Sequence, residues 1–217
     1  MKWRYNGNVS IPVDQVTLEG RLSIPADARD IIVFSHGSGS SRFSPRNTMV
    51  ASHLQRKGFG TLLFDLLTAL EDRRYENRFD IGRLTDRLVG VTGWLEGQEA
   101  AKGCHIGYFG ASTGAASALN AAARLPQTSA VVSRGGRPDL AWEALSKVRC
   151  PVLLIVGSLD REVIELNRSA LQLIKSPKRL SLVPGATHLF EEPGCMEQVC
   201  RLASDWYEVH MHMAKAY

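Results

Sequence analysis

The sequence predicts an α/β protein with a mostly parallel sheet and helices on both faces. Three observations indicate this fold class. Short apolar runs alternate with segments of helical period along most of the 217 residues. Prolines end several of the helical segments. Two alternating segments near the N-terminus predict an antiparallel pair at one edge of the sheet. Regular alternation of strand and helix is typical of a parallel sheet covered on both sides.

Two kinds of strand are predicted. NVSIPV and VTLEGRLSIP alternate apolar and polar residues and are separated by Asp14 and Gln15, so we expect an antiparallel hairpin at the sheet edge. Nearly continuous apolar runs are typical of strands buried on both faces. Four strong runs are DIIVFSHG, GTLLFDLL, CHIGYFG and PVLLIVG, and two weaker runs are SAVVSRGG and KRLSLVPG.

Segments of helical period separate these strands. Ser44 before Pro45 is typical of a helix start, and Pro126 and Pro177 end two helices. The connection from SAVVSRGG to RPDLAWEAL leaves no room for a cap, so we expect one domain over 1–217 with an open, shallow site. The predicted helices cover residues 45–57, 78–96, 113–125, 138–147, 162–174 and 195 to about 213.

The composition excludes several function classes. Hydrophobic residues make up 44% and charged residues 22% of the chain, which is average for a soluble globular protein. The net charge of +4 permits anionic small molecules as ligands, but no Lys/Arg run exceeds two residues, so nucleic acid is not expected as a partner. No segment approaches the ~20 apolar residues of a membrane span, and MKWRYNGNVSIP lacks the apolar core of a signal peptide.

The spacing of the cysteines and of other possible metal ligands does not indicate a metal site. The four cysteines lack CxxC spacing, and no HExxH or similar cluster is present, so neither a metal nor another cofactor is expected. We therefore expect a cytoplasmic protein without membrane contact. The cysteines are Cys104, Cys150, Cys195 and Cys200.

Residues 110–114, GASTG, fit the pattern G-x-S-x-G between the predicted strand CHIGYF and the helix TGAASALNAAARL. A serine at such a turn is lifted above the sheet, and its neighbours must be small. The alternative is a turn whose serine only caps the helix. In this context we expect Ser112 to be a nucleophile.

A serine nucleophile needs a base and an acid that orients the base. Asp160 follows the strand PVLLIVG, and His188 follows KRLSLVPG, in the chain order that this arrangement requires. The alternatives are a helix N-cap for Asp160 and a surface position for His188. We predict that Ser112, Asp160 and His188 form a catalytic triad.

A glycine-rich turn, HGSGSS, follows the strand DIIVFS. It lacks the Lys and Ser/Thr of a phosphate-binding loop, so an oxyanion hole is the better interpretation. We expect the backbone N–H groups of Ser38 and Thr113 to be its donors, with Gly37 as the alternative to Ser38. We expect His36 to be structural, with its ring bonded to loop backbone.

Four arginines lie in loops predicted at the triad end of the sheet: Arg42, Arg46, Arg134 and Arg137. Our hypothesis is that Arg42 and Arg134 bind an anionic substrate. The alternative is solvated charge or an ion pair to a carboxylate within the loops.

Six segments resemble the α/β-hydrolase fold and, within it, the dienelactone hydrolase-like family, from about residue 16 onwards. They are FSHGSGSSRFSPRN, FDLLT, GYFGASTGAASAL, VVSRGGRPDLA, LLIVGSLDREV and VPGATHLFEEPG. SRGGRPDLA combined with GATHLFEEPG is similar to small hydrolases that occur alone or appended to bacterial phosphoribosyltransferases, although no transferase segment is present. The resemblance implies nucleophile, acid and base roles for Ser112, Asp160 and His188. It departs at the elbow, where dienelactone hydrolases proper have cysteine and this chain has serine.

The expected function is therefore a serine carboxylesterase that acts on small, short-acyl esters through an acyl-enzyme. The alternatives are a non-enzymatic scaffold, or a thioesterase, lactonase or acyltransferase that uses the same triad. The expected partner is a small-molecule ester. The sequence leaves open whether the protein is a monomer or a homodimer.

Overall fold

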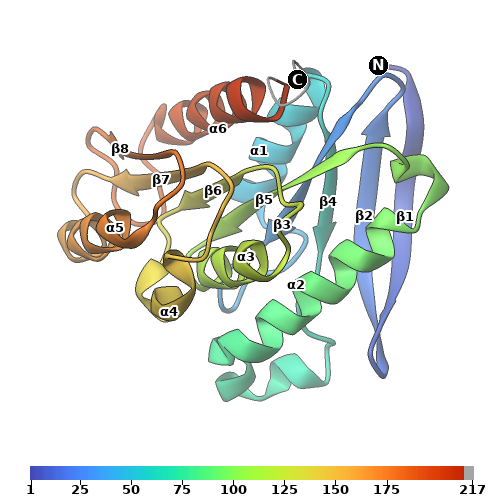
Figure 1. Ribbon diagram of the computed structural model, residues 1–217, viewed down its shortest axis with the longest axis horizontal. Coiled ribbons are helices and arrows are strands. Elements are labelled where there is room, and N and C mark those ends of the chain that lie inside the picture. Colours follow the sequence, from blue (N-terminus) through green and yellow to red (C-terminus); the bar gives the residue numbers. More distant parts are fainter. Residues whose placement is uncertain (213–217) are drawn as a thin grey trace.

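Residues 1–212 are the part of the chain that the computed structural model describes, and within them eight strands form one sheet. The strand order is β1-β2-β4-β3-β5-β6-β7-β8 (Figure 1). The β1–β2 and β2–β4 pairs are antiparallel, and the other pairs are parallel. The strands are β1 (Trp3–Val13), β2 (Val16–Pro25), β3 (Asp30–Ser35), β4 (Gly60–Phe64), β5 (His105–Ala111), β6 (Val131–Arg134), β7 (Val152–Gly157) and β8 (Lys178–Val183).

Helices cover both faces of this sheet (Figure 1). The α-helices are α1 (Pro45–Arg56), α2 (Ile81–Glu96), α3 (Thr113–Arg124), α4 (Trp142–Leu145), α5 (Arg161–Leu173) and α6 (Cys195–His212). Short 3-10 turns add η1 (Glu71–Arg73), η2 (Tyr75–Phe79), η3 (Glu99–Ala101) and η4 (Pro138–Ala141). The predicted α/β fold class is thus confirmed.

The core lies in two layers because alternate residues of each strand point to opposite faces. Tyr108 of β5 packs with α2 and α3, whereas the next residue, Phe109, packs with α1 and α6. Both side chains are fully buried. This double burial explains why the central strands read as continuous apolar runs rather than as alternating ones.

The N-terminal hairpin forms one edge of the sheet, as predicted. Val13 pairs with Val16 across a turn in which Asp14 has a φ of 54°, a conformation that Asp tolerates better than most residues. The strand begins at Trp3, earlier than the sequence pattern indicated, because Trp3 and residues 5–8 still pair with β2.

Three other elements differ from the predicted ones. Helix α2 begins at Ile81 rather than at residue 78, because the Asp80 side chain accepts a hydrogen bond from the Arg83 N–H and caps the helix. The predicted helix 138–147 is divided into η4 and α4. Strand β8 is an exposed edge strand and not a doubly buried one, which explains its weaker apolar pattern. The predicted end of the last helix, at Met213, lies outside the described residues.

No helix within residues 1–212 is both long enough and apolar enough to cross a membrane.

Candidate active site

Ser112 lies at the sharp turn between β5 and α3. Its backbone has φ 52° and ψ −123°, a conformation that costs a non-glycine residue about 1–3 kcal/mol. The turn is held from both sides, because the Ser112 N–H donates to the Arg134 carbonyl (3.2 Å) and the Ser112 carbonyl accepts from the Arg137 N–H (3.1 Å). Ser112 makes no side-chain capping bond to α3. The Ser112 hydroxyl therefore does not cap α3, in contrast to the helix-cap alternative.

Close backbone contacts explain the glycines of the turn. A Cβ at Gly110 would lie 2.4 Å from Ala115 Cα, and a Cβ at Gly114 would lie 2.1 Å from the Ser35 carbonyl oxygen. The first turn of α3 thus packs directly on the carboxyl end of β3. Only a residue without a side chain permits this approach.

Asp160 and His188 are in contact although 28 residues separate them. Asp160 follows β7, and its Oδ2 lies 2.6 Å from His188 Nδ1. Asp160 stands at the N-cap of α5 but makes no side-chain capping bond there. The carboxylate is thus directed to the imidazole and not to the helix, unlike in the N-cap alternative.

The loops that carry these two residues are joined by hydrogen bonds. The Leu159 N–H donates to the Ala186 carbonyl (3.0 Å), and the Gly185 N–H donates to Ser158 Oγ (2.8 Å). Thr187, immediately before His188, donates from both its N–H and its hydroxyl to Glu192 Oε1. These bonds restrict the backbone on either side of the Asp160–His188 pair.

The same stretch of backbone borders Ser112 and His188. A Cβ at Gly135 would lie 3.5 Å from His188 Cε1, and the preceding residue, Arg134, accepts the Ser112 N–H. Within the described residues the Ser112 hydroxyl makes no hydrogen bond to His188. Such contacts commonly tighten only in the substrate complex.

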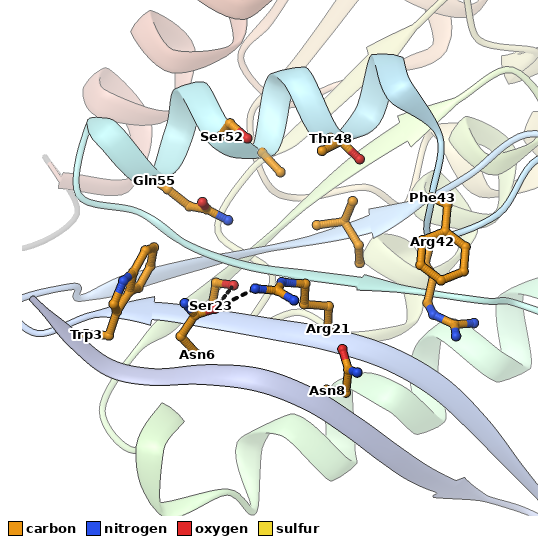
Figure 2. A pocket seen from close by; sticks show the side chains of 12 residues that line it. Trp3, Asn6, Asn8, Arg21, Ser23, Arg42, Phe43, Thr48, Ser52 and Gln55 are labelled. Carbon is orange, nitrogen blue, oxygen red and sulfur yellow. Dashed lines mark hydrogen bonds between the residues drawn. The ribbon is translucent and has the colours of Figure 1, made fainter. Parts of the chain in front are cut away.

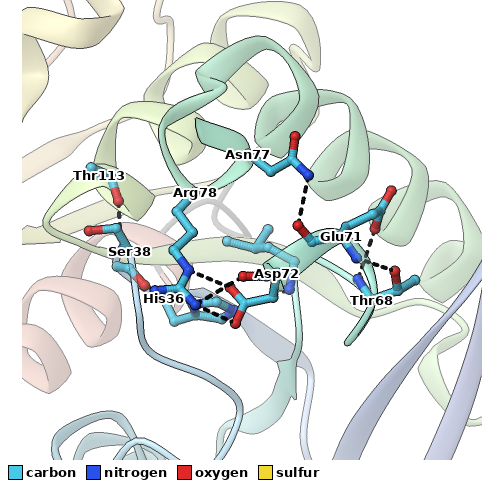
Figure 3. Close-up of polar contacts among 10 residues, drawn as sticks. His36, Ser38, Thr68, Glu71, Asp72, Asn77, Arg78 and Thr113 are labelled. Atoms are coloured by element: carbon cyan, nitrogen blue, oxygen red, sulfur yellow. Dashed lines mark hydrogen bonds and ion pairs between the residues drawn. The ribbon is translucent and has the colours of Figure 1, made fainter. Parts of the chain in front are cut away.

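The loop after β3 lies against the serine. A Cβ at Gly37 would be 3.1 Å from Ser112 Cβ. The Ser38 N–H, expected to be free for an oxyanion, donates to Thr113 Oγ1 at 2.9 Å (Figure 3). The Thr113 N–H begins α3, and no described residue accepts a hydrogen bond from it. The Thr113 N–H, one predicted donor, therefore has no acceptor among the described residues. The Ser38 N–H, the other predicted donor, is bonded to the Thr113 hydroxyl.

The His36 ring makes hydrogen bonds to backbone groups in and beside this loop, in agreement with the predicted structural role. Its Nε2 accepts from the Leu66 N–H (3.1 Å), so the ring proton is on Nδ1 and is donated to the Gly37 carbonyl (3.0 Å). Burial lowers the pKa of His36 below 6.5 and outweighs the Gly37 hydrogen bond and the nearby Asp65 and Asp72, which raise it. The neutral ring is the form that makes both bonds.

The sequence indicated no role for the segment between β4 and α2, which covers the His36 loop. Arg78 binds Asp72 through Nε (2.9 Å) and Nη2 (3.0 Å) (Figure 3). The Arg78 Nη1 would lie 3.8 Å from a Cβ at Gly39. The segment has two short 3-10 turns and few buried residues, so it carries no apolar period that sequence analysis could detect.

The four loop arginines have different environments in the structure. Arg42 binds Asp65 through both its backbone N–H and its guanidinium, Arg137 forms a two-bond ion pair with Asp139, and the partly exposed Arg46 binds Glu191. The Arg42 guanidinium thus has a carboxylate partner at the neighbouring strand end, and its role in substrate binding stays a prediction. Arg42 is thus an example of the ion-pair alternative.

Arg134 differs from the other three. It is only 7% exposed, no residue within 1–212 forms an ion pair with it, and its guanidinium lies 5.7 Å from the centre of the Phe190 ring. Burial, and to a smaller extent the charge of Arg46, lowers the pKa of Arg134 to about 10. Arg134 is therefore a buried charge beside the serine turn without a protein counter-ion among the described residues.

Exposed apolar side chains lie in several of the connections that follow the parallel strands. They come from four connections that follow β3, β6, β7 and β8, and no motif in the sequence marks them. They are Phe43, Leu140, Trp142, Leu159 and Leu189. In the described part of the chain, no group of three or more His, Cys, Asp or Glu side chains is placed to hold a metal ion.

Comparisons with known proteins agree with this fold. Residues 18–213 match the model of the dienelactone hydrolase family. A solved dienelactone hydrolase from Anabaena variabilis is 50% identical, with a TM-score of 0.94 over 97% of this chain and 99% of that one. Est1E from Butyrivibrio proteoclasticus, solved with ferulic acid, has a TM-score of 0.81 over 94% of this chain and 99% of its own, but only 16% identity, and so supports the fold alone.

Two curated relatives from Mycobacterium tuberculosis strains are 54% identical over 205 residues, and both are named putative phosphoribosyl transferase. The match covers 94% of this chain but 46% of theirs, so the chain spans about half their length. The family match extends over most of the chain and coincides with the strand order, the strained serine and the Asp160–His188 pair. The protein belongs to the dienelactone hydrolase family and has the α/β-hydrolase fold.

Proposed function

We propose that the protein is a serine hydrolase that cleaves small carboxylic esters through an acyl-enzyme, with Ser112, Asp160 and His188 as its triad. The observation that carries the proposal is the 2.6 Å contact between Asp160 and His188 at the same sheet edge as the strained Ser112 turn. Family membership supports a hydrolase, and the serine at the elbow favours an ester over the lactone of the family name.

In the proposed reaction, Ser112 Oγ attacks the ester carbonyl carbon while His188 Nε2 takes the hydroxyl proton. Asp160 accepts a hydrogen bond from His188 Nδ1 and stabilises the imidazolium. The C–O bond to the alcohol then breaks, and His188 returns the proton to the departing oxygen. Water repeats the sequence on the acyl-enzyme, which releases the acid and restores Ser112.

The oxyanion of each tetrahedral intermediate would be held by the Thr113 N–H and by a group from the His36 loop. The Ser38 N–H could serve only by exchanging its bond to Thr113 Oγ1 for one to the oxyanion. The Thr113 hydroxyl accepts that bond, so its own proton remains available as a donor. Loss of one oxyanion donor costs about 3–4 kcal/mol of transition-state stabilisation in well-studied hydrolases.

Two features bear on the substrate. The exposed apolar side chains around the loops suit a short acyl or aryl group, and no cap is present in the described residues to enclose a long chain. We further propose that Arg134 binds an anionic group of the substrate, because a buried guanidinium without a counter-ion is costly unless a ligand supplies one. Arg42 is not part of this proposal.

Ser112→Ala tests the proposal. The variant should lose turnover of p-nitrophenyl acetate, by about a million-fold if Ser112 acts as other serine nucleophiles do, while its thermal unfolding stays close to wild type. Ser146→Ala, which changes an exposed serine outside the site, is the matched control. Labelling by a fluorophosphonate should occur in wild type and in the control but not in Ser112→Ala.

Two outcomes would contradict the proposal. Wild-type turnover in Ser112→Ala would exclude Ser112 as the nucleophile. A wild-type protein that neither turns over esters nor reacts with the fluorophosphonate would favour the scaffold alternative. A screen of esters against thioesters and lactones would then decide among reactions that the triad alone does not separate.

A further inference from the structure

A groove of about 380 Å³ lies between α1 and the outer strands β1 and β2 (Figure 2). Neither Ser112, Asp160 nor His188 lines it. Trp3 stands at one end of the groove and Phe43 at the other, with Arg21 between them (Figure 2). None of the three triad residues therefore borders the groove, although Phe43, at one end, also belongs to the exposed apolar side chains of the triad loops.

The groove exists because the two faces of the β1–β2 hairpin differ. On one face, Tyr5 and Val9 pack against the core below α2. On the other face the hairpin extends past α1, and polar residues such as Asn6 and Arg21 occupy it. A register shift between Trp3 and Tyr5 brings Trp3 into the same groove as Asn6.

The Asn6 amide is held in one orientation. Its Oδ1 accepts from the nearly buried Ser23 Oγ (3.0 Å) and from Arg21 Nη2 (3.3 Å). A guanidinium can only donate, so the atom that it contacts must be the amide oxygen. The Asn6 NH₂ group is left as a donor, and no described residue accepts from it.

The opposite wall presents an acceptor. Gln55 of α1 donates from Nε2 to the hydroxyl of the fully buried Thr61 at 2.7 Å, which leaves its Oε1 without a described donor. The amides of Asn6 and Gln55 are each anchored by a buried hydroxyl group. A donor and an acceptor thus face the groove from opposite walls in fixed positions, which lowers the entropy cost of binding.

Charge and apolar surface complete the lining. Arg21 forms no ion pair with any residue in 1–212, and no Asp or Glu lines the groove. Arg42, at the far end, is neutralised by Asp65. The half-buried Trp3 ring and the buried Leu63 supply apolar surface.

We propose that this groove is a second ligand site and that it takes a nucleoside monophosphate, a flat ring joined to a phosphate. The Trp3 ring supplies a stacking surface for the base. Gln55 offers an acceptor to the polar edge of the base, and Arg21 pairs with the phosphate beside the Asn6 NH₂ group, which lies next to the guanidinium. The site does not depend on the proposed ester hydrolysis.

Isothermal titration of the full chain with adenosine 5′-monophosphate tests this assignment. Wild type should bind one equivalent with a Kd below ~1 mM, and Trp3→Ala and Arg21→Ala should each weaken binding about tenfold or more. Trp142→Ala and Arg29→Ala change an exposed tryptophan and an exposed arginine outside the groove, and should bind as wild type does. Esterase turnover should stay unchanged in both groove variants.

Adenosine and inorganic phosphate are also titrated separately, to measure what each part of the nucleotide contributes to binding. Adenosine alone and inorganic phosphate alone should each bind at least about tenfold more weakly than the monophosphate. Arg21→Lys, which keeps the charge, should retain part of the affinity even if Arg21→Ala is less stable, and thermal unfolding of each variant separates lost binding from lost folding.

The following results would overturn the proposal: no saturable binding by wild type, equal binding of phosphate and the monophosphate, or equal losses in the control variants. Loss of binding in Ser112→Ala would also overturn it, because the ligand would then occupy the triad region. None of these results bears on whether Ser112 is a nucleophile.

Discussion

Arg134 is the residue whose environment changes most between sequence and structure. In the sequence it is one of four similar loop arginines, and in the structure it is the buried one that lacks a described carboxylate. Desolvation of a charge costs free energy unless a partner offsets it. The lowered pKa of Arg134, about 10, has the same cause. At neutral pH the group still carries its charge.

Arg134→Met should separate function from stability. Removing a buried charge that has no partner should leave the thermal midpoint unchanged or raise it. The preference for the p-nitrophenyl ester of succinate over that of butyrate, measured as a ratio of kcat/KM, should fall about tenfold or more. Arg137→Met, which removes an arginine already paired with Asp139, is the matched control and should keep the ratio. An unchanged ratio in Arg134→Met would remove Arg134 from substrate binding.

Asp160 is a second residue whose role depends on a contact that is distant along the chain. Its position after β7 was consistent both with an N-cap and with a triad acid. A cap must direct its side chain to the first turn of the helix, and the Asp160 carboxylate instead contacts His188. The contact depends on a loop 28 residues away, so no local pattern could have distinguished the two roles.

At the scale of elements, the junction of α3 with β3 positions the serine turn. The N-terminus of α3 is aimed at the site by packing Gly114 on the Ser35 and His36 carbonyls. The segment between β4 and α2 then covers the His36 loop through the Arg78–Asp72 pair. The first contact is visible in the sequence as glycine, whereas the second has no sequence signature.

Gly114→Ala should therefore lower both stability and activity. The added methyl would lie 2.1 Å from a backbone oxygen, and relief requires α3 to move, at a cost of about 1–3 kcal/mol. Gly93→Ala, at an exposed position of α2 with nothing within 4 Å, is the control and should raise stability by about 0.5–1 kcal/mol. Urea unfolding and p-nitrophenyl acetate turnover measure both effects. Equal stability of the two variants would refute the close-packing argument.

At the scale of the molecule, the neutral His36 ring makes the stability of the folded protein depend on pH. Its pKa is lower in the folded state than in the unfolded chain. The folded state therefore takes up this proton less readily, and the stability that His36 contributes is present above about pH 6.5. That stability is lost as the pH falls from there through the folded pKa.

Urea unfolding at about pH 7.5 and pH 5.5 checks this expectation. The free energy of unfolding of wild type should fall with the pH, by at most about 1.4 kcal/mol per pH unit for this one group. His36→Asn should be less stable at both pH values but should lose less between them. His53 and His210, whose pKa values are also lowered by burial, remain in both proteins and cancel in the comparison. An equal loss in the two proteins would exclude His36 as a source.

The sequence by itself determined the fold class, the order of strands and helices, and the three candidate residues of the triad. These follow from local properties: apolar runs specify buried strands, glycines specify a tight turn, and polar residues after parallel strands meet at one edge. The family resemblance rests on the same residues and is confirmed.

Only the tertiary structure decided which partner each polar side chain has. It gave Arg42 a carboxylate and left Arg134 without one among the described residues, joined Ser38 to Thr113, and opened a groove beside β1 and β2. Hydrogen bonds and ion pairs require approach within a few ångströms of atoms that are distant along the chain. Packing alone sets that approach, and a linear pattern of residues does not contain it.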